Sequence, residues 1–153
     1  MLPLETHLII VFKMKTLSGL WKGSYTFDPE FESENSERYF EMTLHVDDED
    51  EVSGEIRDKV PEDQTSRVAS LSGFIDEGEI SFIKQYPFLL LRNEKNETII
   101  DERKAHPEIH YQGIISDSGM EGSWEMEAAV LFAAGSYHSQ LVTGKWKIVK
   151  AEE

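Results

Sequence analysis

The feature that most constrains this chain is a polar–apolar alternation with a period of two residues, which recurs along almost the whole sequence. This period is typical of a β-strand with one buried and one solvent-facing side. The segments that carry it are residues 20–27, 39–46, 52–58, 67–75, 79–86, 108–116, a long run from 120, and a last run that ends near 150. We find no convincing amphipathic helix, so the sequence predicts an all-β protein.

Turn residues separate these segments at short intervals. Asp28-Pro29 stops the first strand, and Asp76-Glu77-Gly78 predicts a hairpin turn in which glycine supplies a positive φ angle. Asp117-Ser118-Gly119 predicts a further turn. Short turns between successive strands indicate an up-and-down meander. Eight such strands close well into an antiparallel barrel, which removes the exposed sheet edges. The longest connection, residues 88–106, has apolar flanks around a polar tip and is interpreted as a small extra hairpin.

Each of the three tryptophans stands two residues after a glycine, in Gly19-x-Trp21, Gly122-x-Trp124 and Gly144-x-Trp146. The first lies on the first predicted strand and the others on the last two. The first and last strands of a closed barrel are neighbours, so the three motifs are expected side by side at the seam. There glycine lets the sheet curve and tryptophan fills the interior. Further mid-strand glycines share the inward face: Gly23, Gly54, Gly73 and Gly113.

The length of 153 residues fits a single barrel domain over residues 18–150, with residues 1–17 as an N-terminal extension. Within that extension, residues 8–12 are apolar but too few to cross a membrane, and no signal-peptide pattern surrounds them. Two interpretations stay open. Residues 8–12 form an extra edge strand, or Met14 is the natural start and residues 1–13 derive from an upstream start codon.

Charge and cysteine content narrow the function classes. The chain has 30 acidic and 15 basic residues, a formal net charge of −15, so phosphate backbones and anionic membrane surfaces are repelled. Nucleic-acid and membrane partners are therefore not expected. Cysteine is absent, which excludes disulfides and thiolate metal sites. We expect a cytoplasmic protein.

Gly-x-Trp on the first strand of an eight-stranded meander resembles the calycins, the group of lipocalins, fatty-acid-binding proteins and avidins. The later motifs also resemble a group of small bacterial barrels of unassigned function. These motifs are Phe82-x-Lys84-x-Tyr86, His106-Pro107-x-Ile109-x-Tyr111-x-Gly113 and Gly122-x-Trp124. The resemblance covers most of residues 18–150 and implies a barrel whose first tryptophan packs across the closed end. The chain lacks any other lipocalin signature, cysteine pairs, and the helix-turn-helix lid of fatty-acid-binding proteins.

The leading hypothesis is a barrel that binds a small, largely apolar or amphipathic ligand in its lumen. The expected ligand-binding residues are Tyr25, Met42, Phe82, Lys84, Tyr86, Tyr111, Trp124 and Trp146. Lys84 has inward parity, and a buried ammonium invites an anion, so it is expected to orient a polar or acidic head group. Two alternatives remain: Lys84 pairs with a glutamate at the barrel mouth, or it faces the other way.

Other polar clusters give weaker signals. His106 and His110 lie four residues apart beside Asp101 and Glu102, but nothing makes them converge, so a surface histidine pair is preferred over a metal site. The acidic run 47–51 lacks the spacing of a calcium loop and is interpreted as a solvated turn. We expect neither a metal nor a cofactor.

The remaining alternatives concern the end of the barrel and catalysis. The apolar residues 130–132 are interpreted as a lid, a homodimer surface, or a strand extension against residues 8–12, with His138 and Gln140 as polar groups nearby. A packed barrel acting through an oligomer surface is the first alternative function. An enzyme that uses the same cavity is the second, less expected because no nucleophile–base set or nucleotide loop is present.

Overall fold

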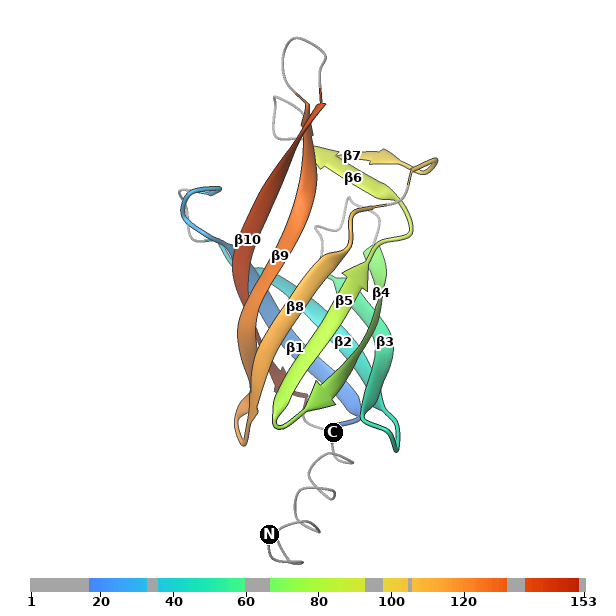
Figure 1. The fold of residues 1–153 in the computed structure, drawn as a ribbon, viewed down its shortest axis with the longest axis vertical. Coiled ribbons are helices and arrows are strands. Elements are labelled where there is room, and N and C mark those ends of the chain that lie inside the picture. The colour runs from blue at the N-terminus through green and yellow to red at the C-terminus, as the bar shows by residue number, and fades with distance from the viewer. Residues whose placement is uncertain are drawn as a thin grey trace, which may run out of the picture.

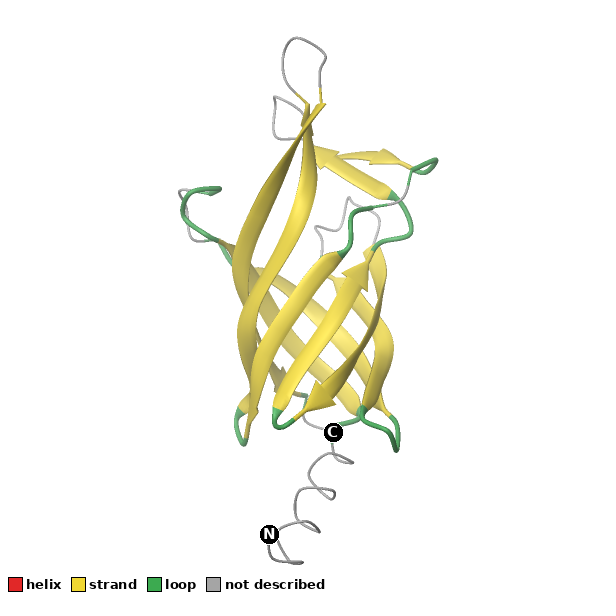
Figure 2. Cartoon of the chain, in the orientation of Figure 1, coloured by secondary structure: helices red, strands yellow, loops and turns green. Residues whose placement is uncertain are grey.

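The computed structural model describes residues 17–32, 36–59, 67–92, 98–104, 106–131 and 137–151. Within these ranges every regular element is a strand (Figure 2). The strands are β1 (Gly19–Phe27), β2 (Arg38–Val46), β3 (Glu51–Asp58), β4 (Arg67–Asp76), β5 (Glu79–Gln85), β6 (Leu89–Arg92), β7 (Thr98–Asp101), β8 (Ile109–Ser116), β9 (Gly119–Leu131) and β10 (Tyr137–Lys150). In the described part of the chain, no helix has the length and apolar character required to cross a membrane.

Eight of the strands close into one antiparallel barrel in the order β1-β10-β9-β8-β5-β4-β3-β2 (Figure 1). Strands β6 and β7 form a separate two-stranded sheet that branches off between β5 and β8. The predicted eight-stranded meander is therefore confirmed, as is the extra hairpin within residues 88–106. The interpretations of residues 1–13, and the side chains of residues 130–132 and His138, lie outside the described residues.

The two ends of the barrel differ in their connections (Figure 1). At one end, here called the short-turn end, β2–β3, β4–β5 and β8–β9 are joined by tight turns. Glu77 and Gly78 have φ angles of 50° and 79°, the signature of a hairpin whose two central residues are both left-handed. Asp47 closes the acidic turn by accepting the backbone N–H groups of Glu49 and Glu51 at 2.9 Å, so the predicted solvated turn is confirmed.

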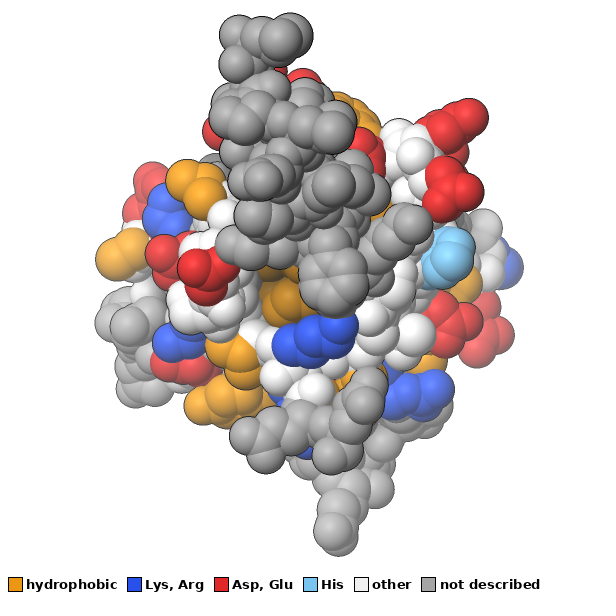
Figure 3. All heavy atoms as spheres, turned by 90° about the horizontal axis from the view of Figure 1, so that it is seen from below, with side chains coloured by type: hydrophobic (Ala, Val, Ile, Leu, Met, Phe, Trp, Pro, Cys, Tyr) orange, Lys and Arg blue, Asp and Glu red, His pale blue; other side chains and the backbone are white. Residues whose placement is uncertain are grey.

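Figure 3 views the molecule from the short-turn end, where acidic and basic side chains are interspersed with hydrophobic atoms. The opposite end is here called the long-loop end, because the longer connections between barrel strands, residues 28–37, 59–66 and 86–108, join them there. Strands β9 and β10 continue past the rest of the barrel at this end, because β8 pairs with β9 only as far as Met126. The two ends thus differ in geometry.

Trp21 fills the interior near the short-turn end. It is 4% exposed and pairs in register with Met42 on β2 and Lys150 on β10. Its indole N–H donates to the Leu17 carbonyl oxygen at 2.8 Å, and the Lys150 ammonium lies 5.9 Å from the ring centroid. This arrangement closes the short-turn end.

The other two Gly-x-Trp motifs face each other across the β9–β10 ladder. Gly144 is the register partner of Trp124, and Gly122 is the register partner of Trp146. The Trp124 indole lies over the bare backbone of Gly144, whereas the Trp146 indole lies over that of Gly113 on β8. The N–H of Trp124 reaches the Thr26 carbonyl oxygen on β1 at 3.1 Å. The predicted seam of three motifs on neighbouring strands is confirmed, and this reciprocal pairing explains why glycine and tryptophan occur at the same spacing twice.

Candidate functional site

A buried ion pair lies in the barrel toward the long-loop end. Lys84 on β5 is only 1% exposed, and its Nζ lies 3.2 Å from Oδ1 of Asp58, the last residue of β3. The Tyr86 hydroxyl donates a hydrogen bond to the other carboxylate oxygen, Oδ2. Asp58 thus joins a cation and a phenol. The predicted inward orientation of Lys84 agrees with this burial, and its carboxylate partner is an aspartate rather than a glutamate.

Aromatic rings surround the Lys84 ammonium. Nζ lies 4.8 Å from the ring centroid of Tyr86, 5.2 Å from that of Tyr25 and 5.8 Å from that of Phe40. Ring faces attract a cation, more strongly where water is excluded. Among the described residues, Asp58 supplies the only hydrogen-bond acceptor to the ammonium. An ammonium has three N–H donors, so this group has capacity for further acceptors.

His106 packs against this cluster. It is 6% exposed, its ring meets the Tyr86 ring edge-on at 5.0 Å, and its Nδ1 lies 2.9 Å from the Pro107 carbonyl oxygen. His110 instead lies on the outer face of β8, where it is exposed beside Glu108. The prediction of a surface histidine pair is therefore wrong for His106, because the loop before β8 turns this residue inward. Within the described ranges, no three His, Asp or Glu side chains are grouped to hold a metal ion.

Burial sets the protonation of the cluster. It lowers the pKa of Lys84, while the charge and hydrogen bond of Asp58 act in the opposite direction. Burial raises the pKa of Tyr86 well above 10.0, and the nearby Asp58 carboxylate raises it further. Burial also lowers the pKa of His106. Tyr86 therefore stays a hydrogen-bond donor throughout the physiological range.

Three of the predicted ligand-binding residues form a tight aromatic group deeper in the barrel. Phe82 and Tyr111 stack at 4.8 Å between ring centroids, and Trp146 meets both rings edge-on at 5.6 Å. All three are at most 4% exposed, and Met42 is completely buried nearer the short-turn end. All four side chains belong to the hydrophobic core. Burial also raises the pKa of Tyr111 well above 10.0.

At the long-loop end, the buried ring of Trp124 lies beside two aromatic side chains that are less completely covered. Trp124 meets the rings of Tyr25 and Phe27 edge-on at 6.1 and 5.0 Å. Tyr25 and Phe27 are both half-buried. The Arg38 guanidinium lies 4.6 Å from the Phe27 centroid, and its Nη2 donates to Glu32 Oε2 at 2.8 Å. Arg38 Nη1 is buried and has no hydrogen-bond partner in the described structure.

Several basic residues occupy inward-facing strand positions at the long-loop end. Inward-facing positions of β2, β4 and β5 carry Arg38, Arg67 and Lys84. Asp58 is an acidic residue that also faces inward here, and it pairs in register with Arg67. This is notable in a chain with a formal net charge of −15. Two of these basic side chains have acidic partners, since Arg38 pairs with Glu32 and Lys84 pairs with Asp58.

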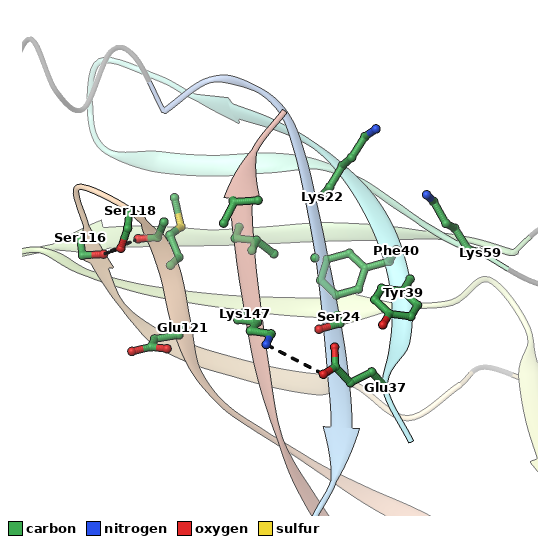
Figure 4. Close-up of a pocket in the computed structure, with 15 residues that line it drawn as sticks. Lys22, Ser24, Glu37, Tyr39, Phe40, Lys59, Ser116, Ser118, Glu121 and Lys147 are labelled. Carbon is green, nitrogen blue, oxygen red and sulfur yellow. Dashed lines mark hydrogen bonds and ion pairs between the residues drawn. The ribbon is translucent and has the colours of Figure 1, made fainter. Parts of the chain in front are cut away.

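Two hollows lined by described residues lie on the outer surface. One, of about 500 Å³, lies over β1, β2 and β10, with Ser24, Tyr39 and Lys147 in its wall (Figure 4). Lys147 is 4.0 Å from Glu37 there. A second groove, of about 570 Å³, adjoins it toward β9. Neither groove contains Lys84, so neither bears on the predicted lumen ligand.

Four of the residues predicted to line the lumen lie in one connected group, because Lys84 contacts the rings of Tyr25 and Tyr86 and Tyr25 contacts Trp124. The prediction did not include the polar partners of this group. Asp58 continues the inward parity of its strand, and a charged residue at such a position was the signal that could have found it. Arg38 carries the same signal at the start of β2. Comparisons of this chain with protein-family models, with curated proteins and with solved structures gave no match.

Proposed function

We propose that this barrel binds a small, largely apolar ligand at its long-loop end, with Lys84 holding an oxygen-bearing head group. The observation that carries this proposal is the buried Lys84 ammonium, which has one hydrogen-bond acceptor at 3.2 Å among the described residues. Burying a charge is costly unless it is paired and hydrogen-bonded. A ligand oxygen supplies the additional acceptor.

The surroundings of Lys84 support an amphipathic ligand. The half-buried rings of Tyr25 and Phe27 and the ring of Trp124 offer apolar contact beside the cation. Covering apolar ligand surface contributes about 25 cal/mol per Å² before the costs of association are subtracted. The unpartnered Arg38 Nη1 offers a second donor to an acidic head group. Both donors belong to inward positions of the same barrel end.

Native mass spectrometry of the freshly purified full chain is the primary test. We expect a co-purifying small molecule, whose mass identifies the ligand class. A second measurement uses naphthoate, an aromatic carboxylate, and follows tryptophan fluorescence during titration. Replacing Lys84 by Met should weaken naphthoate binding about tenfold or more, because a hydrogen bond to a charged group is lost.

The matched control is Lys147→Met, which removes an exposed lysine on the outer face of β10. This control should bind naphthoate with unchanged affinity. A ligand-free protein that shows no saturable response to naphthoate would refute the proposal.

The tight packing deeper in the barrel favours a second candidate, a structural barrel that acts through an interaction surface. Phe82, Tyr111 and Trp146 already satisfy one another's contacts without a ligand. Under this alternative the same mass spectra should show ligand-free protein in a defined oligomer. A ligand-loaded monomer would instead favour the binding proposal.

A further inference from the structure

We infer that Lys84 is a nucleophilic amine that forms a reversible imine with an aldehyde or ketone. The inference rests on the proposed function, because a ligand must first reach Lys84 from the long-loop end. It narrows the ligand class to carbonyl compounds with a flat apolar body. It also gives Lys84 a covalent role in addition to electrostatic attraction.

The contacts of Lys84 suit a protonated imine. A protonated imine keeps the positive charge of the ammonium but has a single N–H. Lys84 makes one described hydrogen bond, to Asp58 Oδ1 at 3.2 Å, and otherwise lies against the rings of Tyr25 and Tyr86. These contacts give one hydrogen-bond acceptor to the single N–H of the imine, and they place aromatic ring faces beside its positive charge. An ammonium in the same place has two N–H donors more than the described acceptors can satisfy.

The neighbouring acid can carry the protons of the reaction. Lys84 first gives a proton to Asp58, and the neutral amine then donates its electron pair to the carbonyl carbon. A C–N bond forms while the carbonyl π pair moves to oxygen. The oxygen takes up one proton from the nitrogen, which gives a neutral carbinolamine. The proton on Asp58 then passes to the hydroxyl, water leaves, and the nitrogen lone pair completes the C=N bond. One ammonium and one carbonyl thus yield one protonated imine and one water, without oxidant or reductant.

Tyr86 positions the acid for this transfer. Its hydroxyl occupies Asp58 Oδ2, which leaves Oδ1 directed at the Lys84 nitrogen. Burial lowers the pKa of Lys84, which increases the fraction of neutral amine available for attack. Lys84 is 1% exposed while Tyr25, whose ring contacts it, is half-buried. The approach of the carbonyl compound is therefore expected to pass Tyr25.

The test is reductive trapping of the full chain with naphthaldehyde and cyanoborohydride at neutral pH. We expect a single adduct per chain, whose added mass equals that of the aldehyde less one oxygen atom. Peptide mapping should place it on Lys84. Labelling of Lys84 should exceed that of exposed Lys147 by about tenfold for each pKa unit that burial removes. Lys84→Arg should lose the adduct, and Lys147→Arg should keep it.

Adducts spread over surface lysines, or an adduct that persists in Lys84→Arg, would overturn the inference. Because the map of the wild-type protein reads the modified residue directly, the result stands even if Lys84→Arg fails to fold. Naphthoate separates this inference from the proposed function, since a carboxylate forms no imine. If naphthoate binds and naphthaldehyde is not trapped at Lys84, the covalent role is wrong and the binding proposal stands. If neither compound binds, both are wrong.

Discussion

Gly144 on β10 lies directly opposite Trp124 on β9, and the indole ring fills the space that a Cβ at Gly144 would need. The same Cβ would also collide with the Thr26 carbonyl oxygen, which accepts the hydrogen bond of that indole. One glycine therefore permits both the close approach of β1 and β10 and the placement of a core tryptophan.

Replacing Gly144 by Ala should destabilise the barrel by at least about 2 kcal/mol, within the range found for overpacked cores. The cause is a collision with backbone as well as with a large ring, so a simple rotamer change cannot relieve it. Chemical denaturation measures the change. Ser123→Ala, an exposed position beside Trp124 on β9, is the control and should alter stability by less than about 0.5 kcal/mol. Equal stability of Gly144→Ala and wild type would contradict the proposed packing.

The buried ion pair should show strong energetic coupling. Asp58→Ala leaves the Lys84 charge without its carboxylate and should cost about 3–5 kcal/mol. Lys84→Met leaves Asp58 with Tyr86 as its donor and should cost less. The double variant should be clearly more stable than the sum of the two single effects predicts, because it leaves no unpaired charge.

Denaturation of the wild type and the three variants completes this double-mutant cycle. Additive effects would mean that the two groups do not interact in solution. In that case both the ion pair and the role of Asp58 as proton carrier in imine formation would have to be abandoned.

His106 should make the stability depend on mildly acidic pH. Burial holds its pKa below the ordinary value of about 6.5, so the unfolded chain takes up a proton more readily than the folded chain. The contribution of neutral His106 to stability is therefore fully present above about pH 6.5, and it is lost as the pH drops through the lowered pKa. The groups that face the His106 ring are Tyr86, Lys84 and Asp58. The Lys84 charge also lowers the pKa of His106, whereas the Asp58 charge raises it.

Denaturation midpoints measured between about pH 7 and about pH 5 check this expectation. His106→Gln should show a shallower loss of stability than the wild type, whereas the exposed His110→Gln should follow the wild type. Parallel profiles for wild type and His106→Gln would show that His106 is not responsible.

Two tyrosines should resist ionisation in the folded protein. Tyr86 and Tyr111 have pKa values raised well above 10.0, so the folded chain keeps their protons after the unfolded chain would lose them. Their contribution to stability is present below about pH 10 and declines as the pH rises further. After an alkaline pH jump, absorbance should show a fast tyrosinate phase and a slow phase that follows unfolding. Tyr86→Phe and Tyr111→Phe should each reduce the slow phase; a smaller fast phase would contradict the burial of that residue.

The architecture was readable from the sequence because its signals are local. Alternation in polarity marks each strand, and turn residues such as Gly78 mark the tight connections. Closure followed from the count of strands and the three Gly-x-Trp motifs. Even the long β9 was indicated by the sequence, since the two-residue alternation that begins at Gly122 continues to Val130.

The candidate site was harder to predict from the sequence, because its residues lie on different strands and the register of the sheet brings them together. Lys84 and Asp58 are 26 residues apart on strands that are not neighbours, and alternation gives only the face of each, not its height in the barrel. His106 stands before β8, where no periodicity assigns a face. The opposition of Trp124 and Gly144 likewise depends on the register of the β9–β10 ladder, which the alternation in polarity does not give.

The seam between β1 and β10 joins the beginning of the barrel to its end, and the Ala151 N–H donates to the Leu20 carbonyl oxygen there at 2.9 Å. A contact of such long sequence separation carries a high loop-closure cost and is typical of slow-folding topologies. On the ribosome, the open edges of β1 and β9 must wait for the last strand to emerge before they can be paired. Until then they are free to pair with other chains. A truncation before β10 is therefore expected to leave an aggregation-prone open sheet in place of a smaller barrel.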